Sequence, residues 1–204
     1  MEPDGRIGGK EVIMAKEELT PMQRQYQEMK ARNKDCILFF RLGDFYEMFN
    51  EDAKLAAREL DLTLTSRDRS KPKEEQTPMC GVPYHSVDAY IARLVQKGYK
   101  VAICEQMEDP ALAKGLVERD ITRIITPGTL IDSSMLEEGK NNYIGGVYAG
   151  SRALGLCLCD ISTGEFYVTS FPAGAEAMDH LKNELGRFSP REAVLSDGAW
   201  SLEG

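Results

Sequence analysis

Apolar residues in the first half of the chain recur at spacings that alternate between helical and strand-like periods. Thr20, Pro21 and Gln23 form a capping box with proline at the first helical position, which predicts a helix from residue 21 to about residue 32. The continuous apolar run of residues 36–40 is typical of a strand that is covered on both faces. Further elements are expected in the order helix, strand, helix, strand, strand, at residues 50–60, 62–66, 87–97, 101–104 and 121–126.

Polar residues and glycines mark where these helices should begin and end. Asn50 and Ser86 precede apolar stripes at helical spacing and are the expected N-caps. Gly98 is the expected stop of the helix that follows Ser86. Helices interleaved with strands in this way predict an α/β sheet with helices packed on it.

The C-terminal part of the chain follows a different pattern. Three alternating segments predict a meander of strands joined by short turns: residues 143–149, 153–160 and 165–170. A helix is expected from residue 175 to residue 185, ended by Gly186, and residues 193–195 could form a fourth strand. One helix over about 60 residues gives a thin core, so the chain is expected to stop inside a domain.

Proline, glycine, serine and asparagine residues interrupt every periodic pattern between the two parts. We therefore expect a linker at residues 127–142, between a first domain at residues 19–126 and a second, partial domain at residues 143–204. Residues 1–18 are charged and aperiodic and are expected to form a disordered tail.

Composition places the chain among ordinary globular proteins. Its 204 residues are 42% hydrophobic, and no apolar run approaches the roughly 18 residues needed to span a membrane. The N-terminus has neither the apolar segment of a signal peptide nor the acid-poor bias of a transit peptide. Five cysteines without paired CxxC spacing fit a reducing cytosol better than a disulfide framework, so a cytoplasmic protein is expected.

The formal net charge of -8 argues against a freestanding basic nucleic-acid binder. This charge is unevenly distributed along the chain. Residues 20–125 carry 17 basic and 17 acidic side chains, so the entire acidic excess lies outside them. A nucleic-acid surface is therefore still compatible with the first domain.

Residues 41–49 are the most informative stretch, because a buried strand there runs into a glycine and then presents aromatic residues around an acid. Gly43 permits a sharp turn that could carry Phe45 out of the sheet. Two interpretations follow from the residues alone. Phe45 is either a core residue at a strand-to-helix junction, or an exposed aromatic wedge with the carboxylate of Glu47 two residues away.

Five segments of the chain resemble the MutS family of DNA mismatch-repair proteins. Residues 43–47 match the family's mismatch-reading motif, in which an aromatic residue and an acid are spaced Phe-x-Glu. The other matches are Thr20-Pro21-Met22 with Gln25-Tyr26, Gly81-Val82-Pro83-Tyr84-His85, Val101-Ala102-Ile103-Cys104-Glu105-Gln106, and Arg123-Ile124-Ile125-Thr126-Pro127-Gly128-Thr129. Together they cover residues 19–130 in order and at the right spacing. Residues 143–204 are more weakly similar to the family's connector domain.

The resemblance implies an α/β fold: a mixed sheet with packed helices, the MutS mismatch-binding domain, followed by a partial RNase H-like α/β connector domain. It implies that Phe45 is the wedge and that Glu47 bonds the displaced base. Arg67 matches a position that contacts the DNA backbone. The remaining DNA-binding candidates are Leu42, Arg69, Lys71, Met79, Tyr84 and His85, with Lys73 in the same basic loop as Lys71.

These residues also have purely structural interpretations. The basic residues could belong to a solvated surface loop. His85 could be a packed loop histidine, and Leu42 and Met79 could be core residues.

The chemistry of an aromatic wedge follows from general principles. A phenylalanine pushed between base steps from the minor groove costs a few kcal/mol of unstacking and kinks the duplex. A mispaired step has already lost part of that stacking, so deformability supplies the selectivity. Near phosphates and partly desolvated, Glu47 should have a raised pKa, which would let the neutral acid donate to a purine or thymine acceptor. The alternative is that Glu47 is a favourable acid at the start of a helix.

The second domain raises a different hypothesis, a metal-dependent, structure-specific nuclease with an RNase H-like fold. Asp160 ends a strand and Glu165 is its only close acidic companion, whereas two-metal chemistry needs several convergent carboxylates. Asp160 with Ser162 and Gly164 is also an ordinary hairpin turn. A third hypothesis, a protein-interaction module without a DNA role, would be favoured if Phe45 proved buried.

The sequence contains no Gly-x-x-x-x-Gly-Lys-[Ser/Thr] phosphate-binding loop, so it should neither bind nor hydrolyse ATP in the manner of the MutS family. We also expect no catalytic residue, metal site or cofactor in these residues. The resemblance places ATP and Mg in a C-terminal ATPase domain that these residues do not include. It implies mismatched double-stranded DNA, a second MutS subunit and a MutL-type protein as partners, with no membrane. The expected location is the bacterial cytoplasm, in association with the nucleoid.

Overall fold

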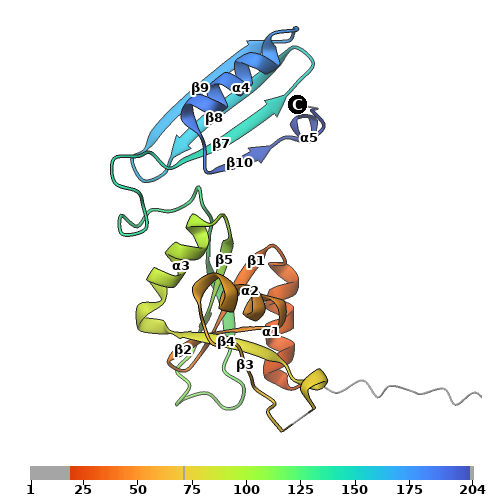
Figure 1. Ribbon diagram of the computed structural model, residues 1–204, viewed down its shortest axis with the longest axis vertical. Coiled ribbons are helices and arrows are strands. Elements are labelled where there is room, and N and C mark those ends of the chain that lie inside the picture. Colours follow the sequence, from red (N-terminus) through yellow and green to blue (C-terminus); the bar gives the residue numbers. More distant parts are fainter. Residues whose placement is uncertain (1–18, 71, 203–204) are drawn as a thin grey trace, which may run out of the picture.

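The computed structural model describes residues 19–70 and 72–202, so the expected disordered tail and Lys71 lie outside the described residues. The chain forms two sheets, each with its own helices, and passes from one to the other once (Figure 1). Among the described residues, no helix is long and apolar enough to cross a membrane.

The first sheet has six strands in the order β3-β4-β2-β1-β5-β6. Strand β1 pairs in parallel with β5, and the other pairs of this sheet are antiparallel. A mixed sheet with helices packed against it confirms the predicted α/β class. Its elements are α1 (Pro21–Arg32), β1 (Cys36–Leu42), β2 (Phe45–Phe49), α2 (Asn50–Leu60), β3 (Thr65–Ser66), η1 (Lys73–Glu75), β4 (Pro78–Pro83), η2 (Tyr84–Ser86), α3 (Val87–Gln96), β5 (Lys100–Gln106) and β6 (Arg119–Ile125).

Helix α1 begins where the sequence predicts. The hydroxyl oxygen of Thr20 accepts a hydrogen bond from the backbone N–H of Gln23 at 3.3 Å, and the Gln23 side chain accepts one from the N–H of Thr20 at 2.9 Å. These bonds satisfy donors that the start of a helix otherwise leaves unpaired. Tyr26 and Met29 are the buried residues of the inner face, which confirms the predicted helix.

Different helices cover the two faces of the first sheet. Strand β1 directs Ile37 and Phe39 into the core beneath α2 and α3, and Leu38 and Phe40 into the core beneath α1. Helix α1 packs mainly on β1 and β6. On the face of the sheet that α1 covers, the start of β2 and strand β4 therefore stay partly exposed.

A buried carboxylate ties α1, α2 and β1 together. Asp52, only 7% exposed, accepts hydrogen bonds from the backbone N–H of Leu38 at 3.0 Å and from the Lys30 ammonium at 2.8 Å. The Tyr26 hydroxyl lies 3.5 Å from the same carboxylate and 3.3 Å from the carbonyl of Phe49. A buried charge with this many partners is tolerated, and it fixes α1 beside the end of β2.

The second sheet has four strands in the order β10-β7-β8-β9. Strands β7 (Tyr143–Ala149) and β8 (Ala153–Asp160) have the predicted bounds, and β9 (Glu165–Pro172) is two residues longer than expected. Strand β10 (Glu192–Leu195) is the expected fourth strand and pairs in parallel with β7. Helix α4 (Ala177–Phe188) packs on one face of the sheet, and the short α5 (Asp197–Trp200) follows β10.

Gly186 does not end its helix, as the sequence pattern suggested. Helix α4 continues to Phe188, and Ser189 follows in the left-handed conformation. The additional residues bring the ring of Phe188 edge-on to that of Tyr143, with the ring centres 5.4 Å apart. Tertiary packing therefore outweighs the low helix propensity of glycine.

Local patterns missed two strands of the first sheet. Residues 45–49 form β2, not a strand-to-helix junction, and Pro78–Pro83 form β4. The strand expected at residues 62–66 is reduced to the two residues of β3. Strands β2 and β4 place Glu47 opposite Gly81 on a partly open face, so neither strand shows the apolar run typical of a fully covered strand.

The two predicted N-caps also differ from expectation. Phe49 occupies the N-cap position of α2, and Asn50 is the first helical residue, with a φ of 55°. Ser86 does hold the N-cap position of α3, but its hydroxyl donates to the carbonyl of Pro83 at 3.4 Å and does not cap the helix. The 3-10 turn η2 runs directly into α3 and takes the place of such a cap. Gly98, with a φ of 90°, follows the end of α3 as predicted.

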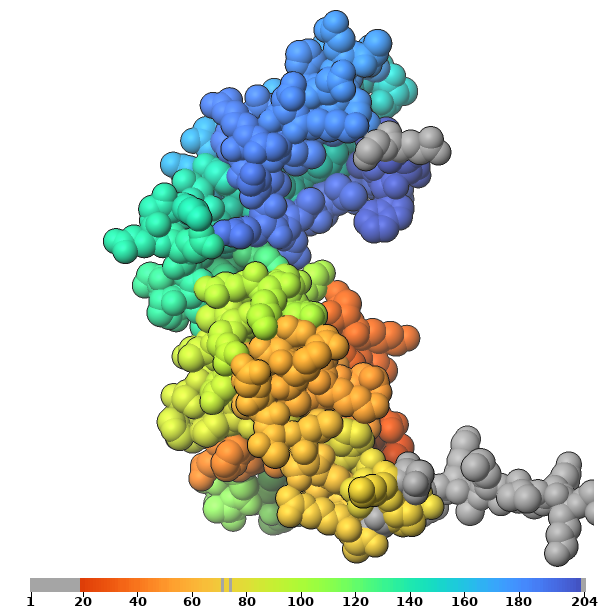
Figure 2. Space-filling view, viewed as in Figure 1, coloured from red at the N-terminus to blue at the C-terminus, as the bar shows by residue number. Residues whose placement is uncertain are grey.

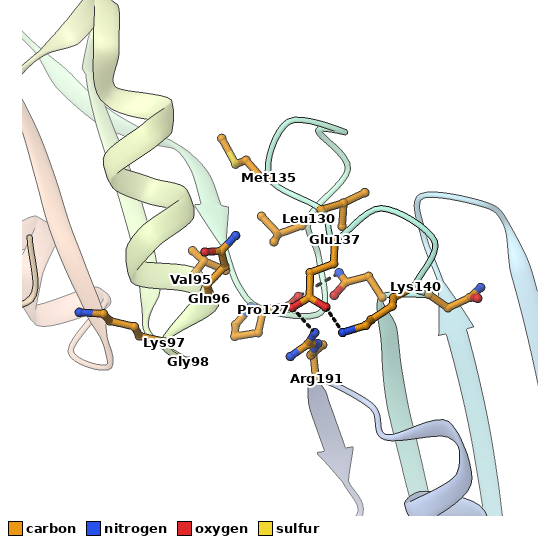
Figure 3. Close-up of a pocket in the computed structure, with 13 residues that line it drawn as sticks. Val95, Gln96, Lys97, Gly98, Pro127, Leu130, Met135, Glu137, Lys140 and Arg191 are labelled. Carbon is orange, nitrogen blue, oxygen red and sulfur yellow. Dashed lines mark hydrogen bonds and ion pairs between the residues drawn. The ribbon is translucent and has the colours of Figure 1, made fainter.

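The start of the segment between the two sheets is held by contacts with the side chain of Glu192. The carboxylate of Glu192 accepts hydrogen bonds from the hydroxyl of Thr126 and from the backbone N–H of Gly128, the latter at 3.1 Å. Its other oxygen lies 3.8 Å from the ammonium of Lys100 in β5. A cleft of about 590 Å³ lies beside this junction, between the end of α3, the linking segment and Arg191 (Figure 3).

Candidate nucleic-acid interface

Phe45 stands at the end of a tight hairpin. Gly43 and Asp44 alone join β1 to β2, and Leu42 lies opposite Phe45 in the register. Gly43 has a φ of 59°, which glycine adopts readily, and glycine at the first of two turn positions matches the twist of the flanking strands. The side chain of Phe45 is 48% exposed. Phe45 is therefore not buried, and a buried Phe45 was the observation that would have favoured a protein-interaction module.

Four of the candidate residues share one face of the sheet: Leu42, Phe45, Glu47 and Met79. Phe45 and Glu47 are two residues apart on β2, so their side chains project to the same side. Leu42 and Met79 are partly buried and pack against the core beneath α1. A Cβ atom at Gly81 would make an ordinary contact with the Cγ of Glu47, at 3.5 Å, and a tighter one with the carbonyl oxygen of Tyr46, at 3.3 Å.

Glu47 is half-buried and paired. Its carboxylate lies 3.5 Å from the guanidinium of Arg67. Burial raises the pKa of Glu47 above its ordinary value, and the positive charge of Arg67 offsets part of this rise. The direction is the one expected beside phosphates, and burial within the protein already produces it. Glu47 is the third residue of β2, so its interpretation as an acid at a helix start is wrong.

The basic candidates lie in the segment between β3 and β4. Arg67 and Arg69 are both exposed, but they point to different partners. Arg67 reaches Glu47, whereas Arg69 donates back to the hydroxyl of Thr65 at 2.8 Å. Lys71 is outside the described residues, and Lys73 begins the 3-10 turn η1. The structure therefore brings Arg67, among these residues, next to the face that carries the wedge candidate.

Tyr84 and His85 lie at the same end of the sheet, behind the hairpin tip. The backbone N–H of Tyr84 donates to the carbonyl of Asp44 at 2.9 Å. The guanidinium carbon of Arg41 lies 3.9 Å from the centre of the Tyr84 ring and also over the ring of Tyr46, a residue of the core beneath α2 and α3. His85 is exposed and packs edge-on against Tyr84. These two candidates therefore lie beside the hairpin tip, on the side opposite to the face that carries Phe45 and Glu47.

Residues 107–118 reach this end of the first sheet as well. Strand β5 runs parallel to β1, so the carboxyl ends of both strands meet at one edge. Gln25 of α1 donates to the carbonyl of Val117 at 3.2 Å, and Arg119 donates to Gln25 at 3.0 Å and to the carbonyl of Arg41 at 2.8 Å. Figure 2 shows this segment, in green, at the end of the first domain that faces away from the second.

Sequence reasoning missed Arg41 and Arg119. Each is held by groups far away in the sequence, and such contacts leave no local periodic pattern. Gln25 lies in one of the matched segments, and it is the one sequence signal that could have led to this edge.

The carboxylate of Asp160 is fully buried and is already used in the turn after β8. It accepts hydrogen bonds from the backbone N–H groups of Asn142 and Ser162, both at 2.9 Å, and from the Ser162 hydroxyl at 2.6 Å. Burial by itself would raise the pKa of Asp160, but these hydrogen bonds outweigh it and lower the pKa. Glu165 instead accepts from the hydroxyl of Tyr143 at 2.8 Å.

The described residues contain no group of three or more His, Cys, Asp or Glu side chains that could hold a metal ion. Cys157 and Cys159 are free thiols, half-buried on β8. The sulfur of Cys157 occupies the space that a side chain at Gly146 would need, 2.5 Å from the position of a Cβ atom. The geometry thus lends no support to the nuclease hypothesis.

Comparison with known proteins gives matches along most of the chain. The family described as MutS domain I matches residues 20–134, and the family described as MutS domain II matches residues 142–203.

Three curated proteins illustrate the similarity, each named DNA mismatch repair protein MutS. The protein from Acetivibrio thermocellus is 57% identical over 178 residues, which are 87% of this chain and 20% of that protein. The protein from Halothermothrix orenii is 58% identical over 177 residues, 87% of this chain and 19% of that protein. The protein from Syntrophomonas wolfei is 52% identical over 185 residues, 91% and 21% respectively. The chain therefore spans about a fifth of the length of the curated relatives that it matches.

Proposed function

Because the chain belongs to the MutS family of DNA mismatch-repair proteins, we propose that its first domain recognises mispaired or unpaired bases in double-stranded DNA by inserting Phe45 as a wedge. The observation that carries this proposal is the 48% exposure of Phe45 at the tip of a tight hairpin, with Glu47 on the same face. A large aromatic side chain in that position contributes little to the core and is available to a partner.

The energetics of insertion favour a mismatch over a paired step. Pushing an aromatic ring between base steps costs a few kcal/mol of unstacking. A mispaired step has already lost part of its stacking and pairing, so the same insertion costs less there. The ring needs no particular pattern of base donors and acceptors. One wedge can therefore serve many kinds of mismatch.

Glu47 supplies the polar contact beside the wedge. In its neutral form the carboxyl group can donate a hydrogen bond to a base, and its raised pKa favours that form. Arg67 pairs with Glu47 in the free chain. The 3.5 Å contact with Glu47 is long for a charge-assisted hydrogen bond, and a DNA phosphate that forms shorter ones draws Arg67 away. Loss of that positive neighbour raises the pKa of Glu47 further and favours its protonation on mismatched DNA, where a displaced base accepts the hydrogen bond.

The other candidate residues position the duplex. Arg67, Arg69 and Lys71 contact backbone phosphates, with Lys73 in the same segment. Contacts of this kind orient a protein on DNA without reading the sequence. Tyr84 and His85 extend the contact behind the tip, and Leu42 and Met79 touch sugar or base edges beside Phe45.

The remaining parts of the proposal concern the full-length protein. ATP and Mg bind in the four fifths of the relatives' length that lie outside this chain. A second MutS subunit and a MutL-type protein complete the assembly, in the bacterial cytoplasm. Residues 20–125 carry no net positive charge, so this chain alone gains little from counterion release and binds DNA weakly.

The wedge is tested by replacing Phe45 with alanine in the full-length protein that carries this domain. Equilibrium binding is measured for a matched and a mismatched duplex at two salt concentrations. Phe45→Ala is expected to lower the affinity for the mismatched duplex until the ratio of the two affinities approaches one. Ile124→Ala is the matched control, because Ile124 is 47% exposed and lies in β6 away from the hairpin tip. Unchanged discrimination in the Phe45→Ala protein would refute the wedge.

Replacing Glu47 separates its charge from its hydrogen bonding. Glu47→Gln keeps a hydrogen-bonding group and removes a negative charge near phosphates, so it is expected to bind matched DNA more tightly. Glu47→Ala should tighten matched binding similarly, but lose about 1 kcal/mol more than Gln on mismatched DNA, because a base contact is missing. If neither replacement alters the ratio of the two affinities, Glu47 has no part in recognition.

A further inference from the structure

The two carbonyl groups of the hairpin turn are both held by donors from outside the turn. The carbonyl of Gly43 accepts a hydrogen bond from the Nε–H of Arg41, and the carbonyl of Asp44 accepts one from the backbone N–H of Tyr84. A two-residue turn can rock about its two peptide planes. With both carbonyls bonded, that motion is restricted, and the position of Phe45 is restricted with it.

Arg41 connects this turn to the rest of the domain. Its guanidinium carbon lies 3.9 Å from the centre of the Tyr84 ring, an arrangement that is favourable for a cation over an aromatic face. Its Nη1 lies 3.7 Å from the carboxylate of Glu105 in β5. The hydroxyl of Tyr46 donates to the same carboxylate, and burial raises the pKa of Tyr46 to about 12, so that hydroxyl stays protonated at neutral pH.

The backbone of Arg41 is fixed as well. Its carbonyl accepts a hydrogen bond from the Nε–H of Arg119 at 2.8 Å, and Arg119 is itself 6% exposed. The side chain of Arg41 is only 17% exposed, whereas Phe45 is an exposed residue. Arg41 is thus mostly covered, held from several directions, and bonded directly to the turn that carries an exposed ring.

We infer that Arg41 is a positioning residue for Phe45, which sets discrimination between mismatched and matched DNA by fixing the hairpin tip. This inference rests on the proposed function. A wedge that moves freely must be ordered when it binds, and that ordering subtracts from the affinity for the mismatch. A wedge that is already held in place loses no affinity to this ordering.

A direct phosphate contact by Arg41 is disfavoured by its surroundings. Its positive charge is paired with Glu105, and one face of its guanidinium lies against Tyr84. A direct contact and a positioning role make different predictions. If Arg41 binds DNA itself, its replacement should weaken binding whether or not Phe45 is present, whereas a positioning residue has nothing to position once Phe45 is removed.

The test is a double-mutant cycle in the full-length protein, with Arg41→Lys, Phe45→Ala and the two combined. Lysine keeps the charge and the partner Glu105, and so the fold, but lacks the planar group that bonds Gly43 while stacking on Tyr84. We expect Arg41→Lys to lower the ratio of mismatched to matched affinity about tenfold when Phe45 is present. In the Phe45→Ala background, the same change should alter the affinity for either duplex by less than about twofold.

Arg93→Lys is the matched control. Arg93 also donates to a backbone carbonyl, that of Leu60 at 3.2 Å, and also pairs with an acid, Asp61, but on the α2–α3 side of the domain. Its replacement should leave the affinity ratio unchanged. Tyr84→Leu is the second variant: it removes the ring beneath the guanidinium and keeps the backbone bond to Asp44. Because Tyr84 is itself a proposed DNA contact, this change should weaken binding in both backgrounds, but it should lower the ratio of mismatched to matched affinity only when Phe45 is present.

Three results would count against these ideas in different ways. An unchanged ratio in Arg41→Lys, or an equal loss of affinity with and without Phe45, overturns the positioning role and leaves the proposed function standing. If the Phe45→Ala single variant still distinguishes mismatched from matched DNA as well as the parent protein, the proposed function and the inference are both overturned. If Arg93→Lys lowers the ratio of mismatched to matched affinity as much as Arg41→Lys does, the effect is a general one of arginine replacement, and the positioning role is again overturned.

Discussion

Phe45 and Phe49 show that neighbours, not residue type, decide burial in this domain. Both side chains lie on the same face of β2, yet Phe45 is 48% exposed and Phe49 only 4%. The ring of Tyr26 in α1 packs edge-on against Phe49, with the ring centres 5.0 Å apart. Phe45 stands at the hairpin tip, outside the core clusters on either face.

Alanine replacements of these two residues should therefore differ strongly in stability. Phe49→Ala leaves a cavity beneath α1 and is expected to lower the free energy of unfolding by about 3 to 5 kcal/mol. Phe45→Ala should cost less than about 1 kcal/mol, because most of the ring's surroundings are already solvent. Denaturant unfolding of the two variants measures the difference. A loss of about 3 kcal/mol or more for Phe45→Ala would place Phe45 in the core and contradict its role as a wedge.

The raised pKa of Glu47 gives the stability of the domain a pH dependence. A carboxyl group whose folded-state pKa lies above its unfolded value of about 4.3 favours folding when protonated. This contribution is fully present below the unfolded pKa and is lost as the pH rises through the folded pKa. Glu47→Gln should therefore raise the melting temperature at pH 7, and the gain should disappear as the pH falls toward about 4.

Asp160→Asn provides a comparison of opposite sign. The pKa of Asp160 is lowered, so its charge stabilises the folded chain above the unfolded pKa, and that stability is lost as the pH falls through the folded pKa. This replacement should lower the melting temperature at pH 7. A melting temperature for Glu47→Gln below that of the parent chain at pH 7 would show that the ion pair with Arg67 outweighs burial.

Strand β2 is an interior strand, and this makes the hairpin a firm support. It pairs with β1 on one side and with β4 on the other, so its backbone is bonded along both edges. Sites built on bonded strands hold their geometry more closely than sites on loops. The turn itself depends on Gly43, whose positive φ is costly for any residue with a side chain.

Alanine at two glycines should have opposite effects on stability. A Cβ atom would meet no neighbour within 4 Å at either Gly43 or Gly186, so crowding does not separate them. Gly43→Ala is expected to cost about 1 to 2 kcal/mol, because the left-handed conformation is strained for alanine. Gly186→Ala, inside α4, should stabilise by up to about 1 kcal/mol, because alanine is the better helix former. Thermal and denaturant unfolding of both variants measure these changes. A change in the free energy of unfolding that has the same sign in both variants would contradict this account.

Glu192 links the two parts of the molecule. Its carboxylate joins β10 of the second sheet to Thr126 at the end of the first domain, to Gly128 in the linking segment, and to Lys100 in β5. Gly128 is packed tightly there, because a Cβ atom would lie 3.0 Å from the side chains of Glu192 and Ile144. The orientation of the proposed mismatch-reading domain therefore depends on a small set of polar contacts.

Glu192→Ala should loosen this junction without unfolding either sheet. A hydrogen bond to a charged group contributes about 1.5 to 3 kcal/mol, so losing even one should speed protease cleavage within residues 126–142 by about tenfold. Cleavage is followed by mass spectrometry, and small-angle scattering checks for a more extended chain.

Glu137→Ala is the control for this prediction. Glu137 also bridges two cations, Lys140 and Arg191, but both lie on the linking segment or next to β10 (Figure 3). Its replacement should leave the attachment to the first domain intact. Equal cleavage rates in the two variants would show that Glu192 does not hold the domains together.

The sequence alone determined the features that depend on near neighbours in the chain. The capping box of α1, the apolar stripes of α2 and α3, the buried strand β1 and the strands β7 and β8 follow from periodicity over a few residues. The Phe-x-Glu spacing is equally local, and it places both side chains on one face of any strand. These predictions needed no knowledge of what packs against each segment.

The tertiary structure decided which of these side chains stay exposed and what holds them. Strands β2 and β4 are half-covered, so their patterns are mixed, and their identity comes from pairing with each other and with β1. The exposure of Phe45, the pairing of Glu47 with Arg67 and the bracing of the turn by Arg41 and Tyr84 all join segments distant in sequence. Local periodicity records whether a residue faces a core, whereas contacts between distant segments depend on the register and order of the strands, which only the folded sheet establishes.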